Sequence, residues 1–308
     1  MIICITPNPA VDRTLILPSL VLGSVQRAKQ SIVAAGGKGL NVARAIRTLG
    51  GETLCTGFAG GHMGHLLADL AQEEGLHFSW TWINSETRTC IILVSQDGDA
   101  TVINEPGMPV SKSDWKRLQR DVRKHVSSAG LVCLSGSLPP NSSADDLQGL
   151  LHMLLDAGKQ VWVDTSGKAL DAALTVPGLC IKVNGEEISK LFGFEVNDVP
   201  SARRALMMLV ERGMSACVIT LGAIGALLST KKGRWNALGP PVRVVSSVGS
   251  GDSFLGGLLS ALDGGKDWPE ALRDAVAAGT ANALSAGGGQ FTFQEFQDIR
   301  GQVQIQAW

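Results

Sequence analysis

The chain has 308 residues, and 37 of them are glycine, well above the average usage of roughly 7%. Lys plus Arg number 27 and Asp plus Glu 28, so the net charge of −1 argues against a nucleic-acid partner, which requires a basic stripe or excess. Hydrophobic residues make up 44% of the chain and charged residues 18%, which excludes intrinsic disorder. The glycines follow no G-X-Y period, so a collagen-like fibre is excluded as well.

Neither a membrane span nor a secretion signal is visible. Apolar runs stay short of the ~18 residues that a transmembrane helix requires, and no basic segment precedes the apolar residues 1–5. We therefore expect a cytoplasmic protein without a membrane partner. The six cysteines are far apart and form no CxxC pair, so we expect buried thiols rather than metal ligands.

Short β-type runs alternate along the chain with segments of helical period. Apolar and β-branched runs predict strands at 2–5, 53–58, 131–134, 161–163, 180–183 and 217–220. Amphipathic spacing predicts helices at 40–49, 65–74, 113–126, 145–155 and 201–212, and helix-ending glycines at Gly50, Gly75 and Gly158. After Asp252 we expect helices at 253–262, 269–285 and from about 293. The alternation predicts an α/β fold with a mostly parallel sheet covered by helices on both faces.

Two regions interrupt this alternation. Residues 14–17 and 25–34 are typical of strands with no helix between them, and residues 89–94 and 101–104 flank Asp97-Gly98, a hairpin turn signal. A second hairpin is indicated at 231–233. We expect one domain over residues 1–308 with a small β lid formed from about 14–34 and 88–104.

The first motif that indicates chemistry is Ala-Gly-Gly-Lys-Gly-Leu-Asn-Val-Ala-Arg at 35–44. Its glycines allow close approach of a ligand to the backbone, and the following helix directs its positive end at the loop. A tight strand-to-helix turn is the alternative. Lys38 and Asn41 inside the turn favour ligand binding, with Lys38 supplying a charge suited to a phosphate.

The second motif is Ser-Val-Gly-Ser-Gly-Asp-Ser-Phe at 247–254, which also leads into a predicted helix. The small residues Gly249, Ser250 and Gly251 expose backbone amides that form an anion hole at a helix N-terminus. Asp252, taken alone, is typical of an ordinary first-turn residue. Beside an anion hole, the better interpretation is a general base that faces a transferred phosphoryl group.

Several common enzyme motifs are absent from the sequence. There is no G-x-x-x-x-G-K-[ST], no G-x-G-x-x-G after the first strand and no G-x-S-x-G, which argues against P-loop NTPases, Rossmann dehydrogenases and serine hydrolases. His62 and His65 lack a third ligand motif, so surface or helix-start histidines are expected there rather than a metal pair.

The two glycine-rich motifs, in this order, resemble those of the ribokinase-type (PfkB) carbohydrate kinase family, and within it the branch of 1-phosphofructokinase and tagatose-6-phosphate kinase. The resemblance covers nearly the whole chain. Further similar segments lie at 6–14, 104–107, 135–140, 164–167, 182–187 and 220–226. The resemblance implies a ribokinase-like α/β fold, with a mostly parallel central sheet, helices on both faces and a small β lid.

The resemblance also implies which residues hold the acceptor. Asp12 is similar to the family Asp that binds sugar hydroxyls, and Gly37 and Asn41 line the same pocket. The residues implied for the phosphate already on the acceptor are Lys38, Arg27, Arg88 and Ser137. Local alternatives stay open: an Asx turn for Asp12, a solvated strand-edge charge for Arg88, and an ordinary turn residue for Ser137.

Another group of residues is implied for the nucleotide side. Asn184 and Glu187 match an N-x-x-E element that organises Mg²⁺ and nucleotide phosphates through water, and they also fit a helix capping box. An ATP-cradling loop and an adenine wall are implied at Thr220, Gly222, Gly225, Gly279 and Asn282. The sequence departs from the family pattern at Val183, Ser250 and Gly287–Gly289, and the glycine run leaves the contacts near the C-terminus open.

The implied reaction converts ATP and a ketohexose monophosphate to the bisphosphate and ADP with Mg²⁺. Fructose 1-phosphate is the favoured acceptor, and tagatose 6-phosphate and fructose 6-phosphate are the alternatives. A kinase of an unphosphorylated sugar and a non-catalytic sugar-phosphate sensor are the rival functions. A homodimer through the lid is also expected from the family.

Overall fold

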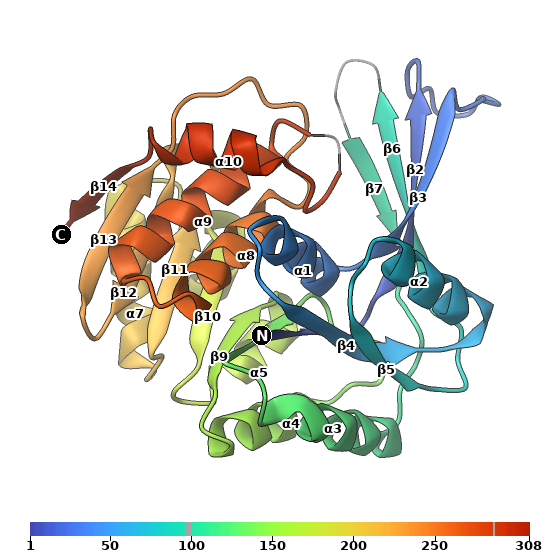
Figure 1. Ribbon diagram of the computed structural model, residues 1–308, viewed down its shortest axis with the longest axis horizontal. Coiled ribbons are helices and arrows are strands. Elements are labelled where there is room, and N and C mark those ends of the chain that lie inside the picture. The colour runs from blue at the N-terminus through green and yellow to red at the C-terminus, as the bar shows by residue number, and fades with distance from the viewer. Residues whose placement is uncertain (96–99, 286) are drawn as a thin grey trace.

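A ten-stranded sheet runs through the molecule in the order β14-β13-β12-β11-β10-β9-β8-β1-β4-β5 (Figure 1). The computed structural model describes residues 1–95, 100–285 and 287–308. From β5 to β11 every pairing is parallel, and β12, β13 and β14 are added antiparallel at one edge. The strands are β1 (Ile2–Thr6), β4 (Thr53–Ala59), β5 (Phe78–Trp82), β8 (Leu131–Ser135), β9 (Gln160–Asp164), β10 (Cys180–Asn184), β11 (Ala216–Thr220), β12 (Ala226–Thr230), β13 (Gly233–Leu238) and β14 (Gln304–Ala307).

Helices cover both faces of this sheet and enclose two apolar clusters. Alternate residues of β1 belong to different clusters: Ile2 and Cys4 pack on one face, Ile3 and Ile5 on the other. The first face is covered by α1 (Lys38–Thr48), α2 (Gly61–Glu73), α8 (Ser250–Asp263), α9 (Trp268–Asn282) and α10 (Phe293–Arg300). The second face is covered by α3 (Lys112–Val126), α4 (Ala144–Asp156), α5 (Gly167–Ala173), α6 (Gly185–Phe192) and α7 (Val199–Glu211).

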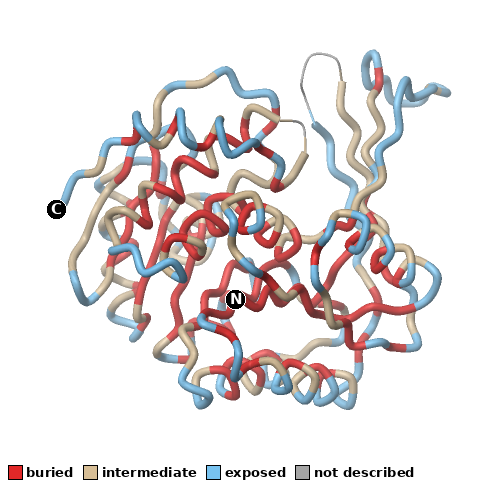
Figure 2. The backbone as a smooth tube through the Cα atoms, viewed as in Figure 1, coloured by how far each residue is buried: buried red, intermediate tan, exposed pale blue. Residues whose placement is uncertain are grey.

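A separate four-stranded sheet, here called the lid sheet, projects at the upper right of Figure 1. Its order is β3-β2-β6-β7, with β2 (Ala10–Leu17), β3 (Gln30–Gly36), β6 (Arg88–Ser95) and β7 (Ala100–Asn104). Figure 2 shows the main sheet mostly buried and the lid strands mostly intermediate or exposed. The register joins Asp12 to Ala34 on one side and to Cys90 on the other, so Asp12 lies near the base of the lid sheet.

The predicted α/β alternation and the ribokinase-like fold are confirmed. Residues 25–29 precede β3 instead of belonging to it, and the expected turn at Asp97-Gly98 lies outside the described residues. The sequence prediction missed β5, α5 and β14. The short segments of α5 and β14 show little apolar periodicity, whereas the alternation Phe-Ser-Trp-Thr-Trp of β5 was a usable strand signal that was overlooked.

Smaller expectations are also confirmed. All six cysteines are buried thiols. Gly50, Gly75 and Gly158 follow α1, α2 and α4 with φ of 83°, 67° and 72°, the left-handed conformation that ends a helix. Over the part of the chain that the structure describes, no helix is long and apolar enough to cross a bilayer.

Candidate active site

The candidate site lies at the carboxyl ends of the parallel strands, where α/β proteins commonly bind ligands. Asp164 ends β9 and Asn184 ends β10, while the two glycine-rich motifs start α1 and α8. Contacts between α1 and α8 therefore bring together residues about 210 positions apart in the sequence: Asn41 Nδ2 donates to Asp252 Oδ2 at 2.8 Å.

The glycines of the first motif let the chain turn tightly against β1. Gly37 is the N-cap of α1, with φ of 123°, and a Cβ at this position would lie 2.7 Å from Thr6 Cγ2. A Cβ at Gly39 would overlap Thr6 Oγ1. Larger residues would push α1 away from β1, and Lys38, which lies between these glycines, would move with it.

Asp164 joins two lysines in an ion-pair network that sequence analysis missed. Lys182 Nζ lies 2.8 Å from Asp164 Oδ2, and Lys38 Nζ lies 3.2 Å from Oδ1. Burial alone would raise the pKa of Asp164, but the two ammonium groups hold it below its usual range. The same carboxylate, with Asp252 and Glu187, raises the pKa of Lys38. Lys38 is thus fixed as a cation, and the charges of both lysines act on Asp252.

The second motif forms the N-terminal turn of α8 as predicted. Its N-cap, Gly249, has φ of 77°, and a Cβ there would overlap Gly288. The amide of Ser250 donates to the carbonyl of Ser247 at 3.2 Å, which leaves the amides of Gly251 and Asp252 in the first turn. A Cβ at Gly251 would lie 2.8 Å from Lys182 Nζ, so an ammonium group lies beside these amides. The turn offers an anion both hydrogen bonds and positive charge.

Asp252 itself is only 6% exposed. Burial raises the pKa of its carboxyl group to about 6, with Asp164 also raising it, while Lys38, Lys182 and the Asn41 hydrogen bond act in the opposite direction. A carboxyl group with this pKa is ionised at neutral pH but binds a proton far more readily than an ordinary aspartate. That is the property expected of a general base.

A second carboxyl group faces the site from the lid sheet. Asp12 lies against Gly36, where any Cβ would overlap its carboxylate. Burial raises the pKa of Asp12 to about 6, Arg44 and Arg88 lower it, and Asp252 raises it. The effect of Asp252 on Asp12 indicates that the two carboxyl groups approach the same space from different elements.

Arg88 and Ser137 are brought together through a residue that sequence analysis did not single out. Arg88 Nη2 donates to the carbonyl of Asn8 at 2.9 Å, and Asn8 Nδ2 donates to Ser137 Oγ at 3.2 Å. Arg88 Nη1 donates to the carbonyl of Glu105 at 2.9 Å. Within the described residues, Arg88 Nε and Asn8 Oδ1 are buried and have no hydrogen-bond partner. Such groups are typical of a site that binds a polar ligand.

Arg27 is not brought to this cluster. It is exposed in the connection between β2 and β3, beyond Gln30, whereas Gly36 at the base of β3 contacts Asp12. From Gln30 to Gly36 the strand has seven residues, and the six steps between them span roughly 20 Å at ~3.3 Å per residue. The structure thus separates Arg27 from the other predicted phosphate-binding residues.

The N-x-x-E element starts α6 as a reciprocal capping box. Glu187 N–H donates to Asn184 Oδ1 at 2.8 Å, and Asn184 N–H donates to Glu187 Oε2 at 2.9 Å. The other carboxylate oxygen, Oε1, lies 3.7 Å from Lys38 Nζ. A pocket of about 580 Å³ between α5 and α6 is lined by both residues. The local capping role is confirmed, and it leaves Glu187 Oε1 directed at the cationic centre.

Glycines of the expected nucleotide loop differ in why they are needed. Thr220 ends β11, and the short helix Gly222–Ile224 follows it. Gly222 has φ of 57° and open space around its Cβ position, so only its conformation requires glycine. A Cβ at Gly225 would overlap the carbonyl of Ala237, and one at Gly279 would lie 3.0 Å from the carbonyl of Ser250. The last two are therefore explained by close packing.

The C-terminal glycine run packs behind the α8 turn. A Cβ at Gly288 would lie 2.8 Å from Asn41 Nδ2, and one at Gly289 would lie 2.6 Å from the Asn41 carbonyl. The fully buried Asn282 donates to the carbonyl of Val248 at 2.8 Å and accepts from Ser253 Oγ at 3.1 Å. The contacts of Asn282 thus hold the loop at the start of α8, and Gly288 and Gly289 allow the chain to lie against Asn41.

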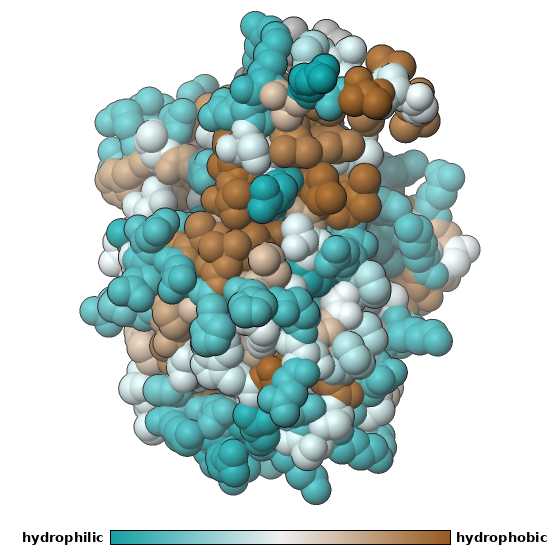
Figure 3. All heavy atoms as spheres, turned by 90° about the vertical axis from the view of Figure 1, so that its right-hand side faces the viewer, coloured by the Kyte–Doolittle hydropathy of each residue, from teal (hydrophilic) through white to brown (hydrophobic). Residues whose placement is uncertain are grey.

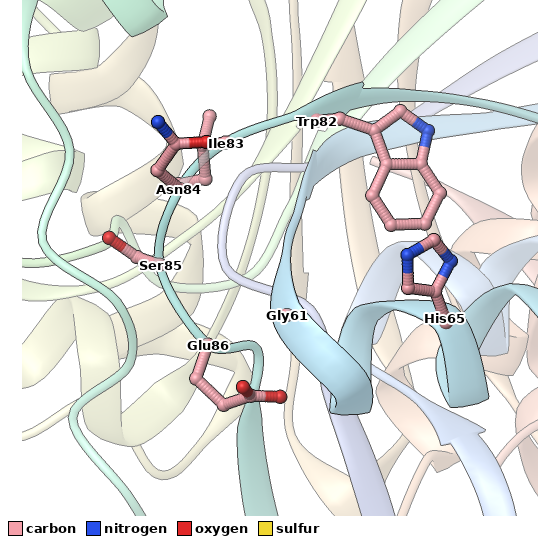
Figure 4. Close-up of a pocket in the computed structure, with 7 residues that line it drawn as sticks. All are labelled: Gly61, His65, Trp82, Ile83, Asn84, Ser85 and Glu86. Atoms are coloured by element: carbon pink, nitrogen blue, oxygen red, sulfur yellow. The ribbon is translucent and has the colours of Figure 1, made fainter.

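Another pocket, of about 570 Å³, lies apart from these residues at the N-terminus of α2 (Figure 4). Its lining includes His65, whose ring stacks on Trp82 with centroids 4.5 Å apart. Glu86 lines it too and accepts from the backbone amide of Met63 at 2.5 Å. Glu86 thus already places a carboxylate at the N-terminal turn of α2, where an anion would otherwise bind. Within the described residues, the structure has no group of three His, Cys, Asp or Glu side chains placed to hold a metal ion.

Buried carboxylate, cationic groups and helix amides at one sheet edge are the parts that phosphoryl-transfer enzymes use. The shared pattern of pfkB family carbohydrate kinases matches residues 5–293, and the chain belongs to this family. It is a kinase that phosphorylates an alcohol group, as the sequence predicted, and the family implies ATP as phosphoryl donor.

Individual relatives match over nearly their full lengths. The chain is 29% identical to tagatose-6-phosphate kinase of Staphylococcus epidermidis over 308 residues, covering 99% of each chain. It is 30% identical to 1-phosphofructokinase of Vibrio cholerae serotype O1, covering 99% of this chain and 96% of the relative. The tetrameric inhibited form of phosphofructokinase-2 from Escherichia coli superposes with a TM-score of 0.91 at 30% identity, covering 97% of this chain and 98% of the other.

Proposed function

We propose that this kinase transfers the terminal phosphoryl group of ATP to a hydroxyl group of a ketohexose monophosphate, with fructose 1-phosphate as the preferred acceptor. The observation that carries the proposal is the buried Asp252, which adjoins two lysines on one side and faces Asp12 on the other. Relatives named for tagatose 6-phosphate and fructose phosphates support this acceptor class.

Asp252 acts as the general base that accepts the proton of the attacking hydroxyl group. The amides of Gly251 and Asp252, with Lys182 beside them, stabilise the charge on the transferring phosphoryl group. Lys38 contacts Asp164 and Glu187 in this same centre, so we assign its charge to the donor phosphates rather than to the phosphate already on the acceptor. The positive charge of Lys38 also stabilises the ionised form of Asp252 and so lowers the pKa of this base.

The acceptor is held from the lid side. Asp12 binds sugar hydroxyl groups, and Gly37 and Asn41 line the same pocket. Arg88 and Ser137 bind the phosphate that the acceptor carries, since the buried Arg88 Nε–H has no partner among the described residues. Arg27 lies at the far end of the lid sheet and has no part in this site within one chain.

The nucleotide occupies the side of α6 and the 220–225 loop. The donor set suits Mg²⁺, because the ion prefers few carboxylates together with water and substrate phosphates, and Glu187 Oε1 is the carboxylate oxygen that the capping box leaves over. Thr220 and Gly222 lie at the adjoining strand end, and Gly225 and Gly279 shape the backbone around it. Mg²⁺, when bound, would neutralise phosphate charge.

The decisive experiment is an ADP-release assay with fructose 1-phosphate, tagatose 6-phosphate and fructose 6-phosphate, compared by kcat/KM. We expect the highest value for fructose 1-phosphate and at least a 10-fold preference over unphosphorylated fructose. Highest activity on tagatose 6-phosphate or fructose 6-phosphate would move the assignment within the class. If no sugar phosphate stimulates ADP release, the proposed function is overturned and a non-catalytic sensor is favoured. If kcat/KM is equal for phosphorylated and unphosphorylated sugars, a simple sugar kinase is favoured.

We also propose that two copies of the chain associate through the lid sheet. Large apolar side chains are exposed there: Ile32 (43%), Val102 (43%) and Ile103 (52%). The neighbouring connection exposes Leu22 and Val25 almost completely. Figure 3 shows apolar residues gathered on this side of the molecule. Ile32 and Val102 lie on one face of the lid sheet and Ile103 on the other, because side chains alternate along a strand. Apolar side chains exposed in this number on one small sheet are typical of a protein interface.

A further inference from the structure

A continuous chain of hydrogen bonds leads from the C-terminal end of α2 to the base Asp252. Glu74, directly after α2, receives a two-pronged ion pair from Arg44: Nε lies 2.5 Å from Oε2, and Nη2 lies 2.9 Å from Oε1. Arg44 Nη1 donates to Asn41 Oδ1 at 2.7 Å, and Asn41 Nδ2 donates to Asp252 Oδ2 at 2.8 Å. The side chain of Arg44 is only 12% exposed.

This arrangement determines the direction of the Asn41 amide. A guanidinium group has only donors, so the Asn41 atom that faces Arg44 must be the oxygen. The NH₂ group must then face Asp252, where it can only donate. Gly288 and Gly289 pack against the side chain and the carbonyl of Asn41, which closes the remaining space around the amide.

We propose that Arg44, held by Glu74, is a positioning residue that fixes the Asn41 amide so that it donates to Asp252 and keeps this base ionised. The inference rests on the proposed role of Asp252. A carboxylate that accepts a hydrogen bond is stabilised in its charged form. If Arg44 is removed, the amide can rotate and present its oxygen to Asp252, which then favours the protonated acid.

Other charged groups face Asp252, and a change at Arg44 leaves them in place. They are Lys38 of α1, Asp164 of β9, Lys182 of β10 and Asp12 of β2. Arg44 also acts on Asp12 directly, because its charge lowers the pKa of that carboxyl group. A test must therefore separate the path through Asn41 from this second effect.

Arg44 has a structural contact as well. Its Nη2 also donates to the carbonyl of Ala35 in β3, and Glu74 Oε1 accepts from the Ala35 amide at 3.2 Å. Removing Arg44 therefore loosens the base of β3, which can reduce stability. The milder variant Glu74→Gln keeps Arg44 and its bond to Ala35 but weakens the ion pair that aims the guanidinium group.

The first measurement is kcat against pH from 5 to 9 for the parent, Arg44→Gln and Glu74→Gln. We expect the acidic limb of Arg44→Gln to move upward by about one pH unit and that of Glu74→Gln by a smaller amount. Because the base is regenerated at high pH, kcat of both variants at pH 9 should lie within about 3-fold of the parent. Equal loss at every pH, or an unmoved limb in both variants, would show a merely structural role.

Arg47→Gln is the matched control. Arg47 lies one turn further along α1 and donates to the backbone carbonyl of Glu74, but it is exposed and does not reach Asn41 in the hydrogen bonds of the structure. It should leave the acidic limb unmoved. A shift equal to that of Arg44→Gln would mean that any lost cation on this helix produces the effect, and the positioning role would be rejected.

A double-mutant cycle with Asn41→Ala tests the path. If Arg44 acts through Asn41, the double variant should show the same limb as Asn41→Ala alone, whereas additive shifts would assign the effect to Asp12. Titration of the Asp252 carboxyl carbon by NMR in the substrate-free protein, identified by its loss in Asp252→Asn, gives a readout that needs no turnover. An upward shift in Arg44→Gln supports the inference even if the parent phosphorylates no sugar phosphate, which would contradict the proposed function alone.

Discussion

The ten-stranded sheet and the lid sheet both contribute residues to the candidate site, but they differ in how deeply they are buried. Every residue of β1 in the main sheet is buried, and every residue of β7 in the lid sheet is exposed. The main sheet and its helices supply Lys182, Asp164 and Asp252, which contact or influence one another across the parallel strand ends. The lid sheet supplies Asp12 and Arg88. The groups proposed for the chemical step are thus on the deeply packed sheet and its helices, and the groups proposed to hold the acceptor are on the lid sheet.

The largest effect should come from the chemistry on the main-sheet side. Asp252→Asn keeps the volume and removes the base, so we expect kcat to fall at least ~100-fold with little change in the affinity for either substrate. The folded-state pKa of about 6 exceeds the unfolded value, so ionisation of Asp252 costs stability above pH 6. The variant should therefore unfold no earlier than the parent at pH 8. ADP release, calorimetric binding and thermal unfolding measure these results, and near-normal turnover would remove Asp252 as the base.

The ion-pair network beneath the base should matter next. Asp164→Asn leaves the buried Lys182 without its anionic partner, and breaking such a pair costs about 3 kcal/mol of unfolding free energy. The pKa of Asp164 is lowered in the folded state, so its stabilising effect is present at neutral pH and lost as the pH falls below about 4.

Urea unfolding at pH 7 and pH 3.5 measures this change, with the difference between parent and variant shrinking at the lower pH. The control is Asp171→Asn, an exposed residue of α5, which should change the free energy by less than about 0.5 kcal/mol. Equal stability of parent and Asp164→Asn at pH 7 would mean that the network contributes nothing to folding.

On the lid side, Arg88→Ala should act on the acceptor rather than on the chemical step. Loss of a charge-assisted hydrogen bond to the phosphate should raise the acceptor KM about 10-fold and leave kcat within about 3-fold. The control Arg13→Ala removes an exposed cation from the opposite face of β2, next to Asp12, and should leave KM unchanged. Steady-state kinetics decide, and an unchanged acceptor KM in Arg88→Ala would assign the phosphate to other residues.

The same contrast explains what the sequence could predict. Strands of the main sheet are apolar on both faces, so their runs were visible, and the two glycine-rich motifs located Lys38, Asn41 and Asp252. The edge strand β14 was missed because its sequence, Gln-Ile-Gln-Ala, has little apolar content. The edge strand β5 was missed although its Phe and Trp residues alternate with Ser and Thr as in a half-buried strand. The lid strands were predicted because these segments interrupt the alternation of strands and helices. The predicted strand at 25–34 began too early, since residues 25–29 precede β3.

Contacts between residues of separate motifs could not be predicted from the sequence. The pairing of Asp164 with Lys182 depends on the neighbouring positions of β9 and β10, although a lysine inside the apolar run of β10 was a usable signal, since a buried lysine requires a partner. Arg44 could be taken for a solvent-exposed helix residue, and only the packing of α2 and Gly289 against α1 shows that it is enclosed. Within the glycine run at 287–289, unexplained in the sequence, Gly288 and Gly289 are required by that same packing, whereas a Cβ at Gly287 would meet the side chain of Gln290.

The smallest effect on activity is expected at the exposed lid surface, and it tests whether that surface has a partner. Ile103→Asp places a charge on the exposed strand β7, where it cannot disturb the core, so kcat should stay within about 2-fold. If two copies meet through the lid sheet, burying this carboxylate without a partner would be costly, and sedimentation analysis should show the dimer shifted toward monomer. Val244→Asp, an equally exposed apolar site outside the lid sheet, should keep the assembly of the parent. A dimer that Ile103→Asp leaves intact would contradict association through this face of the lid sheet. A parent that is monomeric would contradict association through the lid altogether, and the exposed apolar surface would then belong to the single chain.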